Sequence, residues 1–209
     1  MMKSSKTMRM FIDGNNYYNS TNELLGEDFK VDLYQLLLDV RDHFQKNYYP
    51  CYFDRAFYFS ALPLRTDNPE KYDEHKSFLG FISKFRFLTV KEGFLAKRPK
   101  TKDIPIDIND DGTYYYVEKE TDVNLSNEML ESAFNQKYDV GLLFAADGDY
   151  ADTLIRLREY PVEIFAVLPD GAPSGRIQNV LGSHRIIRLP KDFYKRQKEE
   201  NKTIISMNP

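Results

Sequence analysis

Short apolar runs that end abruptly alternate with segments of helical periodicity along this chain. The runs MFI at 10–12, VGLLFAA at 140–146 and IFAVL at 164–168 have few polar breaks, which is typical of strands covered on both faces. Asp32 and an Asn-Pro pair at 68–69 are predicted to open two helices. The pattern predicts further strands at 51–62, 86–96, 114–119 and 184–189, and helices at 31–45, 68–85, 122–136, 150–160 and 174–182.

Strands that alternate with helices imply right-handed βαβ units and a largely parallel sheet. We therefore predict an α/β fold, a three-layer α/β/α sandwich whose mainly parallel central sheet has about five strands. The polar segment 97–113 contains prolines and an Asp-Asp-Gly sequence, which favours a loop or the tip of a β-hairpin. We expect one domain over 1–190, with this insertion at about 86–119, and a charged tail over 191–209.

Composition narrows the function classes. With 209 residues and 42% hydrophobic content the chain can form a real core, and its net charge of −3 gives no overall attraction to nucleic acid. Any polyanion binding would therefore need a local patch. The single cysteine, Cys51, excludes an internal disulfide framework and a cysteine-rich zinc site. No apolar stretch reaches the length of a signal-peptide core or a membrane span, so we expect a cytoplasmic protein without a membrane partner.

Aspartates follow two of the apolar runs. Asp13 comes directly after the first run, and Asp147 and Asp149 come after the second. Ligands of such sheets bind beyond the carboxyl ends of the strands, where the strand order reverses. If the two runs form neighbouring strands, these three aspartates share one crevice. Asp122 begins the helix that leads into the second strand and can project into the same place.

Each aspartate also has an ordinary structural interpretation, as a turn former or a helix cap. Asp149 suits the N-cap of the helix at 150–160, and an N-cap role explains Asp122 as well. Asp13 and Asp147 each end an apolar run and are each followed by Gly, and for this pair we favour the functional interpretation. Asn16 either holds a water or an Asp13 oxygen, or is a simple loop amide.

Grouped carboxylates disfavour one another's ionised forms unless a cation compensates. A hard divalent ion such as Mg²⁺ binds a few carboxylates while keeping waters and accepting phosphate oxygens. One or two such ions can generate a hydroxide nucleophile and stabilise the charge that develops on a phosphodiester. The sequence therefore predicts a divalent-metal site at the mouth of the sheet.

Three motifs carry a family resemblance. FIDGNN contains Asp13 and Asn16, KETDVNL contains Asp122, and LLFAADGDYADTL contains Asp147 and Asp149. In this order they resemble the NYN domain, a family of PIN-like nucleases that includes the LabA/DUF88 proteins. The resemblance extends over residues 8–190 or so.

The resemblance implies a PIN-like fold and a metal-dependent ribonuclease activity with Mg²⁺ or Mn²⁺. It implies metal ligands at Asp13, Asp122 and Asp147, a further acid beside the metal at Asp149, and Asn16 lining the site. Ala145 and Ala146 stand where the family commonly has Ser-Gly, which leaves room for a retained fold with altered activity.

Basic residues with aromatics between them occupy 84–102. Lysine and arginine contacts to phosphate are nonspecific and salt-sensitive, whereas Phe and Tyr faces stack on unpaired bases. The alternative is a solvated hairpin with ordinary surface lysines. The candidate RNA-binding residues are Lys97, Arg98, Lys100, Lys102 and Lys119.

We predict a Mg²⁺- or Mn²⁺-dependent endoribonuclease that acts on single-stranded or loop RNA. The alternative is a regulatory or scaffold module that keeps the fold and binds RNA or a protein without cutting. An aspartyl phosphatase ranks below both, because Ala151 stands where such enzymes have Thr or Val. No Gly-x-Gly-x-x-Gly follows a strand, which argues against a dinucleotide site. Homo-oligomer formation stays open.

Overall fold

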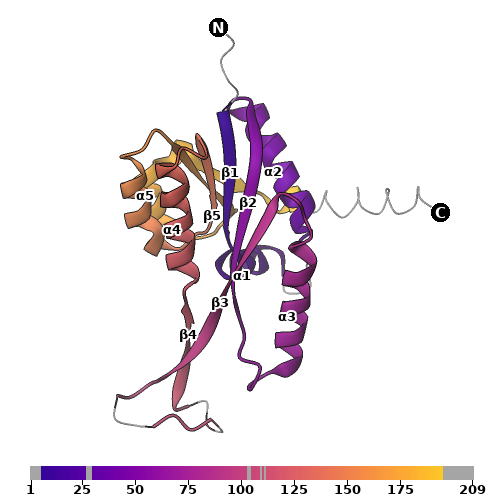
Figure 1. Ribbon diagram of the computed structural model, residues 1–209, viewed down its shortest axis with the longest axis vertical. Coiled ribbons are helices and arrows are strands. Elements are labelled where there is room, and N and C mark those ends of the chain that lie inside the picture. Colours follow the sequence, from indigo (N-terminus) through magenta and orange to yellow (C-terminus); the bar gives the residue numbers. More distant parts are fainter. Residues whose placement is uncertain (1–5, 27–29, 103–104, 109, 111, 195–209) are drawn as a thin grey trace, which may run out of the picture.

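A computed structural model describes residues 6–26, 30–102, 105–108, 110 and 112–194 (Figure 1). Its strands are β1 Lys6–Asp13, β2 Cys51–Leu62, β3 Leu88–Pro99, β4 Tyr114–Lys119, β5 Val140–Phe144, β6 Glu163–Pro169 and β7 Ile186–Leu189. Its helices are α1 Gly14–Leu25, α2 Leu33–Asn47, α3 Pro69–Ile82, α4 Thr121–Phe134, α5 Ala151–Leu157 and α6 Gly175–Leu181, with short 3₁₀ turns η1 Gly148–Tyr150 and η2 Ser183–Arg185.

The strands form one sheet in the order β4-β3-β2-β1-β5-β6-β7. Every neighbouring pair is parallel except β3 and β4. The predicted α/β class is confirmed, but the sheet has seven strands where about five were expected. The two edge strands account for the difference, since β4 returns antiparallel along β3 and the short β7 pairs with β6.

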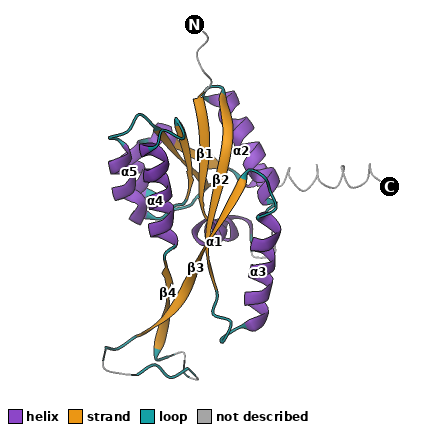
Figure 2. Cartoon of the chain, in the orientation of Figure 1, coloured by secondary structure: helices purple, strands orange, loops and turns teal. Residues whose placement is uncertain are grey.

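Helices cover both faces of the sheet, which gives three layers (Figure 2). One core lies between the sheet and α1, α2 and α3, and contains Met10, Ile12 and Leu36. The other lies between the sheet and α4, α5 and α6, and contains Phe11 and Leu143. Successive residues of β1 enter opposite cores because side chains alternate along a strand. None of the helices in the described ranges is long and apolar enough to cross a membrane.

The predicted helix starts are confirmed where their caps are described. Asp32 accepts a hydrogen bond from the backbone N–H of Gln35, and Asn68 accepts one from Lys71. The hydrophobic pattern does not predict α1. This helix fully buries only Gly14, Tyr17 and Thr21, and Leu24 and Leu25 pack against the core from its last turn, so its apolar stripe is short and interrupted by polar residues.

The packed part of the chain extends past the predicted boundary at residue 190. Phe193 and Tyr194 are buried in the core beside α2. The hydroxyl of Tyr194 lies 2.7 Å from that of Tyr17 on α1. The predicted tail from residue 195 onward lies outside the described residues.

The predicted hairpin is formed by β3 and β4. β3 pairs with β2 only from Leu88 to Phe94, and from Phe94 to Pro99 it pairs with β4. This second part projects beyond the body of the domain as an arm (Figure 1). We use the word arm for the described residues of 94–119. Residues 103, 104, 109 and 111 lie outside the described part.

Candidate active site

The candidate site lies at the carboxyl ends of β1 and β5. Strands β2, β3 and β4 follow one another outward from β1 in one direction along the sheet. The chain then crosses back, and β5 pairs with the opposite side of β1. Such a reversal of strand order is the usual position of ligand sites in α/β sheets. Asp13 is the last residue of β1, and Asp147 follows β5 after two alanines. The expectation that the two strands are neighbours is confirmed.

Asp13 is almost completely buried, with 3% of its surface exposed. Its Oδ1 accepts a hydrogen bond from the backbone N–H of Asn16 at 3.0 Å and caps α1, while its Oδ2 accepts one from the Tyr150 hydroxyl at 2.8 Å. Burial raises the pKa of Asp13 to about 7, and the charges of Glu118 and Asp122 add to this rise against the effect of the two hydrogen bonds. The cap interpretation is therefore correct for this residue, which lies buried at the carboxyl end of β1.

The carboxylates of Asp122 and Asp13 both contact the hydroxyl of Tyr150. Asp122 lies in the first turn of α4, and its Oδ1 is 3.0 Å from the oxygen of Tyr150. Its side chain is partly open to solvent, yet partial burial of the carboxyl group raises its pKa, and Glu118, Asp147 and Asp149 raise it further. The cap interpretation of Asp122 is wrong, because Glu120 occupies the cap position.

Asp147 and Asp149 lie on the rim of this group. Oδ1 of Asp147 accepts a hydrogen bond from the backbone N–H of Asp149 at 3.0 Å and caps η1. Asp149 is exposed, with one oxygen 3.5 Å from Nη1 of Arg176. The alternative interpretation of Asp149 as the cap of the following helix is wrong, because Tyr150 stands at the N-cap position of α5. Both carboxylates are close enough to Asp122 to raise its pKa.

Asn16 is neither a loop amide nor a side-chain partner of Asp13. It lies in the first turn of α1, and its Oδ1 accepts a hydrogen bond from the backbone N–H of Ala146 at 2.8 Å. The side chain therefore joins the residues that follow β1 to those that follow β5.

Glu118, at the end of β4, is an acid of this group that the sequence does not predict. Its Oε2 accepts a hydrogen bond from the Asn15 amide at 2.9 Å, and the Ser60 hydroxyl donates to the other end of that amide at 2.7 Å. Ser60 also contacts Nε2 of His75 at 2.9 Å. Oε1 of Glu118 is buried without a hydrogen-bond partner among the described residues. The only sequence signal was a charged pair at the end of an aromatic strand, four residues before Asp122.

A cleft of about 500 Å³ opens beside the acidic group. Its lining includes Asn16, Glu23, Asp147, Gly175 and Arg176. Of the four candidate aspartates, Asp147 alone lines this cleft, which extends to the largely exposed side chain of Arg176.

The donor chemistry decides which kind of metal the acidic group fits. Among the described residues, no group of three or more His, Cys, Asp or Glu side chains is arranged to hold one ion. Asp13 and Asp122, however, direct carboxylate oxygens at one point. Mg²⁺ is usually bound by one or two carboxylates and completes its shell with waters and substrate phosphate. The pair fits such an ion and does not fit a cage made entirely of protein ligands.

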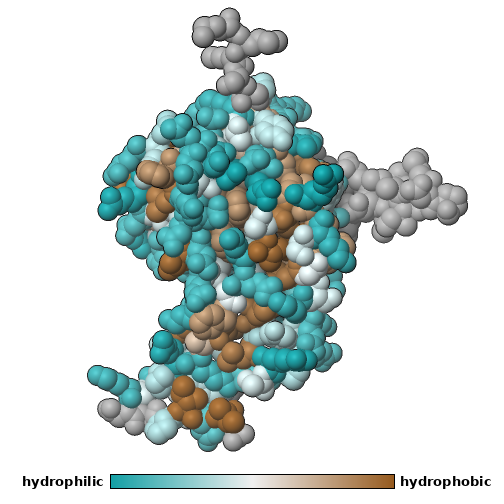
Figure 3. All heavy atoms as spheres, in the orientation of Figure 1, coloured by the Kyte–Doolittle hydropathy of each residue, from teal (hydrophilic) through white to brown (hydrophobic). Residues whose placement is uncertain are grey.

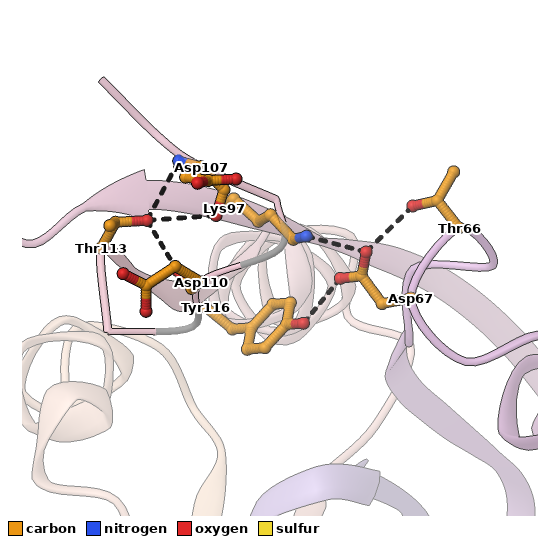
Figure 4. Close-up of polar contacts among 7 residues, drawn as sticks. All are labelled: Thr66, Asp67, Lys97, Asp107, Asp110, Thr113 and Tyr116. Atoms are coloured by element: carbon orange, nitrogen blue, oxygen red, sulfur yellow. Dashed lines mark hydrogen bonds and ion pairs between the residues drawn. The ribbon is translucent and has the colours of Figure 1, made fainter.

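The predicted RNA-binding residues are not gathered at the acidic group. Nζ of Lys97 lies 2.8 Å from Oδ1 of Asp67 and 4.2 Å from the centre of the Tyr114 ring. The Tyr116 hydroxyl donates to the other oxygen of Asp67 at 2.6 Å (Figure 4). These contacts lower the pKa of Asp67. They hold the arm against the connection between β2 and α3, so Lys97 has a structural partner.

The remaining basic candidates are spread along the arm. Arg98, Lys100 and Lys102 are exposed towards its tip. Lys119 is half-buried at its base, opposite Phe94 and next to the start of α4.

The sequence profile of the NYN domain matches residues 7–185. This chain belongs to the NYN domain family. The match runs from β1 into η2 and includes all four candidate aspartates. The resemblance carried by the three motifs is thus confirmed, and with it a place among nuclease-like proteins.

No curated protein matches this NYN domain protein. A crystal structure of a protein of unknown function from Vibrio parahaemolyticus is similar to it, with a TM-score of 0.57 and 15% sequence identity. The similarity covers 92% of this chain and 99% of the other. At this identity the likeness shows the fold alone.

Proposed function

We propose that this NYN domain protein is a metal-dependent endoribonuclease that hydrolyses RNA phosphodiesters with Mg²⁺ or Mn²⁺. The observation that carries the proposal is the convergence of Asp13 and Asp122 on one point at the reversal of strand order. Burial and the charges of neighbouring carboxylates, Glu118 among them, raise the pKa of both acids. A cation would relieve this excess of negative charge.

In this proposal Asp13 and Asp122 hold the cation, and Asp147 and Asp149 are further acids beside it. A divalent ion supplies an activated water and stabilises the charge that develops on a phosphodiester. The residues of the chain provide the geometry. Asn16 fixes the end of β5 relative to α1 through Ala146, and the buried setting of Asp13 limits the water around its carboxylate.

The cleft beside the carboxylates is the proposed position of the RNA strand. It reaches from Asp147 to Arg176, and the guanidinium of Arg176 is largely exposed. An exposed guanidinium is well suited to phosphate oxygens. One ordinary ion-pair partner, Asp149, lies near it, and the separation of 3.5 Å is long for a hydrogen bond.

The arm is the proposed RNA-guiding element. Antiparallel pairing places Phe94 opposite Lys119 and Arg98 opposite Tyr115, so these four side chains share one face of the hairpin. Phe94 and Tyr115 are 48% and 49% exposed. Apolar side chains are visible among polar ones along the arm in Figure 3. Exposed rings stack on unpaired bases and basic groups contact phosphate, which favours single-stranded or loop RNA.

A second candidate function is an RNA- or protein-binding module that keeps the fold without cutting. Two observations favour it: the described residues contain no group of three acids arranged around one ion, and the residues before Asp147 are Ala145 and Ala146.

The test is cleavage of a circular single-stranded RNA, which has no ends for an exonuclease. Wild type with Mn²⁺ is expected to linearise the RNA, and EDTA, Asp13→Asn or Asp122→Asn is expected to abolish this. Asn retains the ability to cap a helix, so Asp13→Asn should fold. Asp152→Asn, an exposed acid on α5, is the matched control and should cut like wild type. RNA that is bound but left intact by wild type would favour the second candidate, and cleavage that survives both substitutions would reject the site.

A further inference from the structure

Tyr150 occupies an unusual position for a buried tyrosine. Only 1% of its surface is exposed, and its ring packs in the core beneath α4, α5 and α6. Its hydroxyl emerges at the acidic group, 2.8 Å from Oδ2 of Asp13 and 3.0 Å from Oδ1 of Asp122. The packing of the ring and the contacts of the hydroxyl are therefore separate features of one side chain.

A phenol has one proton and can donate it to one carboxylate at a time. When both acids are ionised, the second carboxylate then faces an oxygen lone pair with no proton between them. The carboxylates of Asp13 and Asp122 thus contact one neutral phenol oxygen, which offsets only part of their negative charge. Opposite charge favours ionised carboxylates far more than a single neutral donor does.

The proposed function places a divalent cation between the same two carboxylates. We infer that the Tyr150 hydroxyl holds the place of this cation in the cation-free protein. It keeps Asp13 and Asp122 together, and an incoming ion takes over their oxygens from the phenol. Tyr150 is in this account a positioning residue that competes with the cation. The inference rests on the proposed function.

Substitution by phenylalanine separates the two features, because Phe fills the same ring volume without the hydroxyl. In Tyr150→Phe the cation-free carboxylates lose their shared donor and the ion loses its competitor. Loss of the competing hydroxyl favours cation binding, and we expect this gain to exceed the cost of losing its positioning contact. A hydrogen bond to a charged group corresponds to an effect on the order of tenfold or more in an equilibrium constant.

The test is a calorimetric titration of the full chain with Mn²⁺ in the absence of RNA. Tyr150→Phe is expected to bind Mn²⁺ roughly tenfold more tightly than wild type. Tyr138→Phe is the matched control, since Tyr138 is also buried but its hydroxyl donates to the backbone oxygen of Met129. Its Mn²⁺ affinity should equal that of wild type. Affinity that is unchanged or weaker in Tyr150→Phe would overturn the inference while leaving the metal site intact.

A second measurement does not depend on a folded variant. With ring-labelled tyrosine, saturation of wild type with Mg²⁺ is expected to shift the NMR signal of Tyr150 and to leave that of Tyr138 in place. A Tyr150 signal that stays fixed at saturation would also overturn the inference. A wild-type protein that binds neither ion would instead reject the proposed metal-dependent function itself.

Discussion

Asn16 and Ala146 are joined by a hydrogen bond of 2.8 Å from the backbone N–H of Ala146 to the side-chain oxygen of Asn16. The two residues are far apart in the sequence and belong to the segments that follow β1 and β5. Because Asp13 precedes one of them and Asp147 follows the other, this bond sets the relative position of two candidate acids.

Removing that acceptor should destabilise the protein. Asn16→Ala leaves a half-buried N–H without its partner, and an unsatisfied group of this kind costs about 1–3 kcal/mol. Urea denaturation should show this loss in the free energy of unfolding. Asn19→Ala, at an exposed position on the same helix, should stay within about 0.5 kcal/mol of wild type. Equal stability of the two variants would contradict the role given to Asn16.

The glycine after Asp13 is required by packing. A Cβ at Gly14 would lie 2.4 Å from Cζ of Tyr58, and Tyr58 is itself buried. Gly14→Ala should therefore cost several kcal/mol, on the order of 3, as overpacking does. Gly80→Ala has open space around the new methyl group and should gain about 1 kcal/mol of helix stability. Thermal unfolding of the two variants should shift in opposite directions, and a shift in the same direction would contradict the packing at Gly14.

Glu118 is expected to contribute to cation binding. Its charge raises the pKa of both Asp13 and Asp122, so removing it should weaken the attraction for a divalent ion. Glu118→Gln should lower Mn²⁺ affinity by roughly tenfold, as nearby charges commonly do. Glu120→Gln makes the same chemical change at an exposed position two residues away and should lower it much less. Similar losses of Mn²⁺ affinity in both variants would show a general effect of charge and would contradict a specific contribution of Glu118.

Stability without cations should fall as pH rises. The pKa of Asp13 is raised from 3.8 to about 7, so between these values the folded state binds more protons than the unfolded state. The stabilisation from this group is complete below pH 4 and is lost as pH passes through about 7, by at most about 4 kcal/mol. Denaturation in EDTA across this range should show the fall, and Asp13→Asn should flatten it. A wild-type curve as flat as that of the variant would contradict the assignment.

The sequence predicts the layers of this fold well because they depend on local signals. The buried runs of β1, β5 and β6 and the apolar stripe of α2 follow directly from periodicity. The position of Asp13 and Asp147 at the carboxyl ends of neighbouring strands also follows from the sequence, whereas a ligand role for Asp122 follows only from the family resemblance. α1 is not predicted because it buries few residues and its apolar stripe is short and interrupted by polar residues.

The parts that the sequence does not predict depend on contacts between distant segments. Glu118 reaches the acidic group only because the arm returns to the sheet beside α1. The Tyr150 hydroxyl meets two carboxylates that precede it by many residues. The sequence groups Lys97 with its basic neighbours, whereas the fold pairs it with Asp67 in the connection between β2 and α3. No local pattern encodes such partners.

The most direct measurement is anomalous diffraction from crystals soaked in Mn²⁺. The account predicts an anomalous peak within coordination distance of both the Asp13 and Asp122 carboxylates. That peak should be absent from crystals of Asp13→Asn. A peak that avoids these two side chains, or a fully soaked crystal with no peak near the ends of β1 and β5, would contradict the proposed centre.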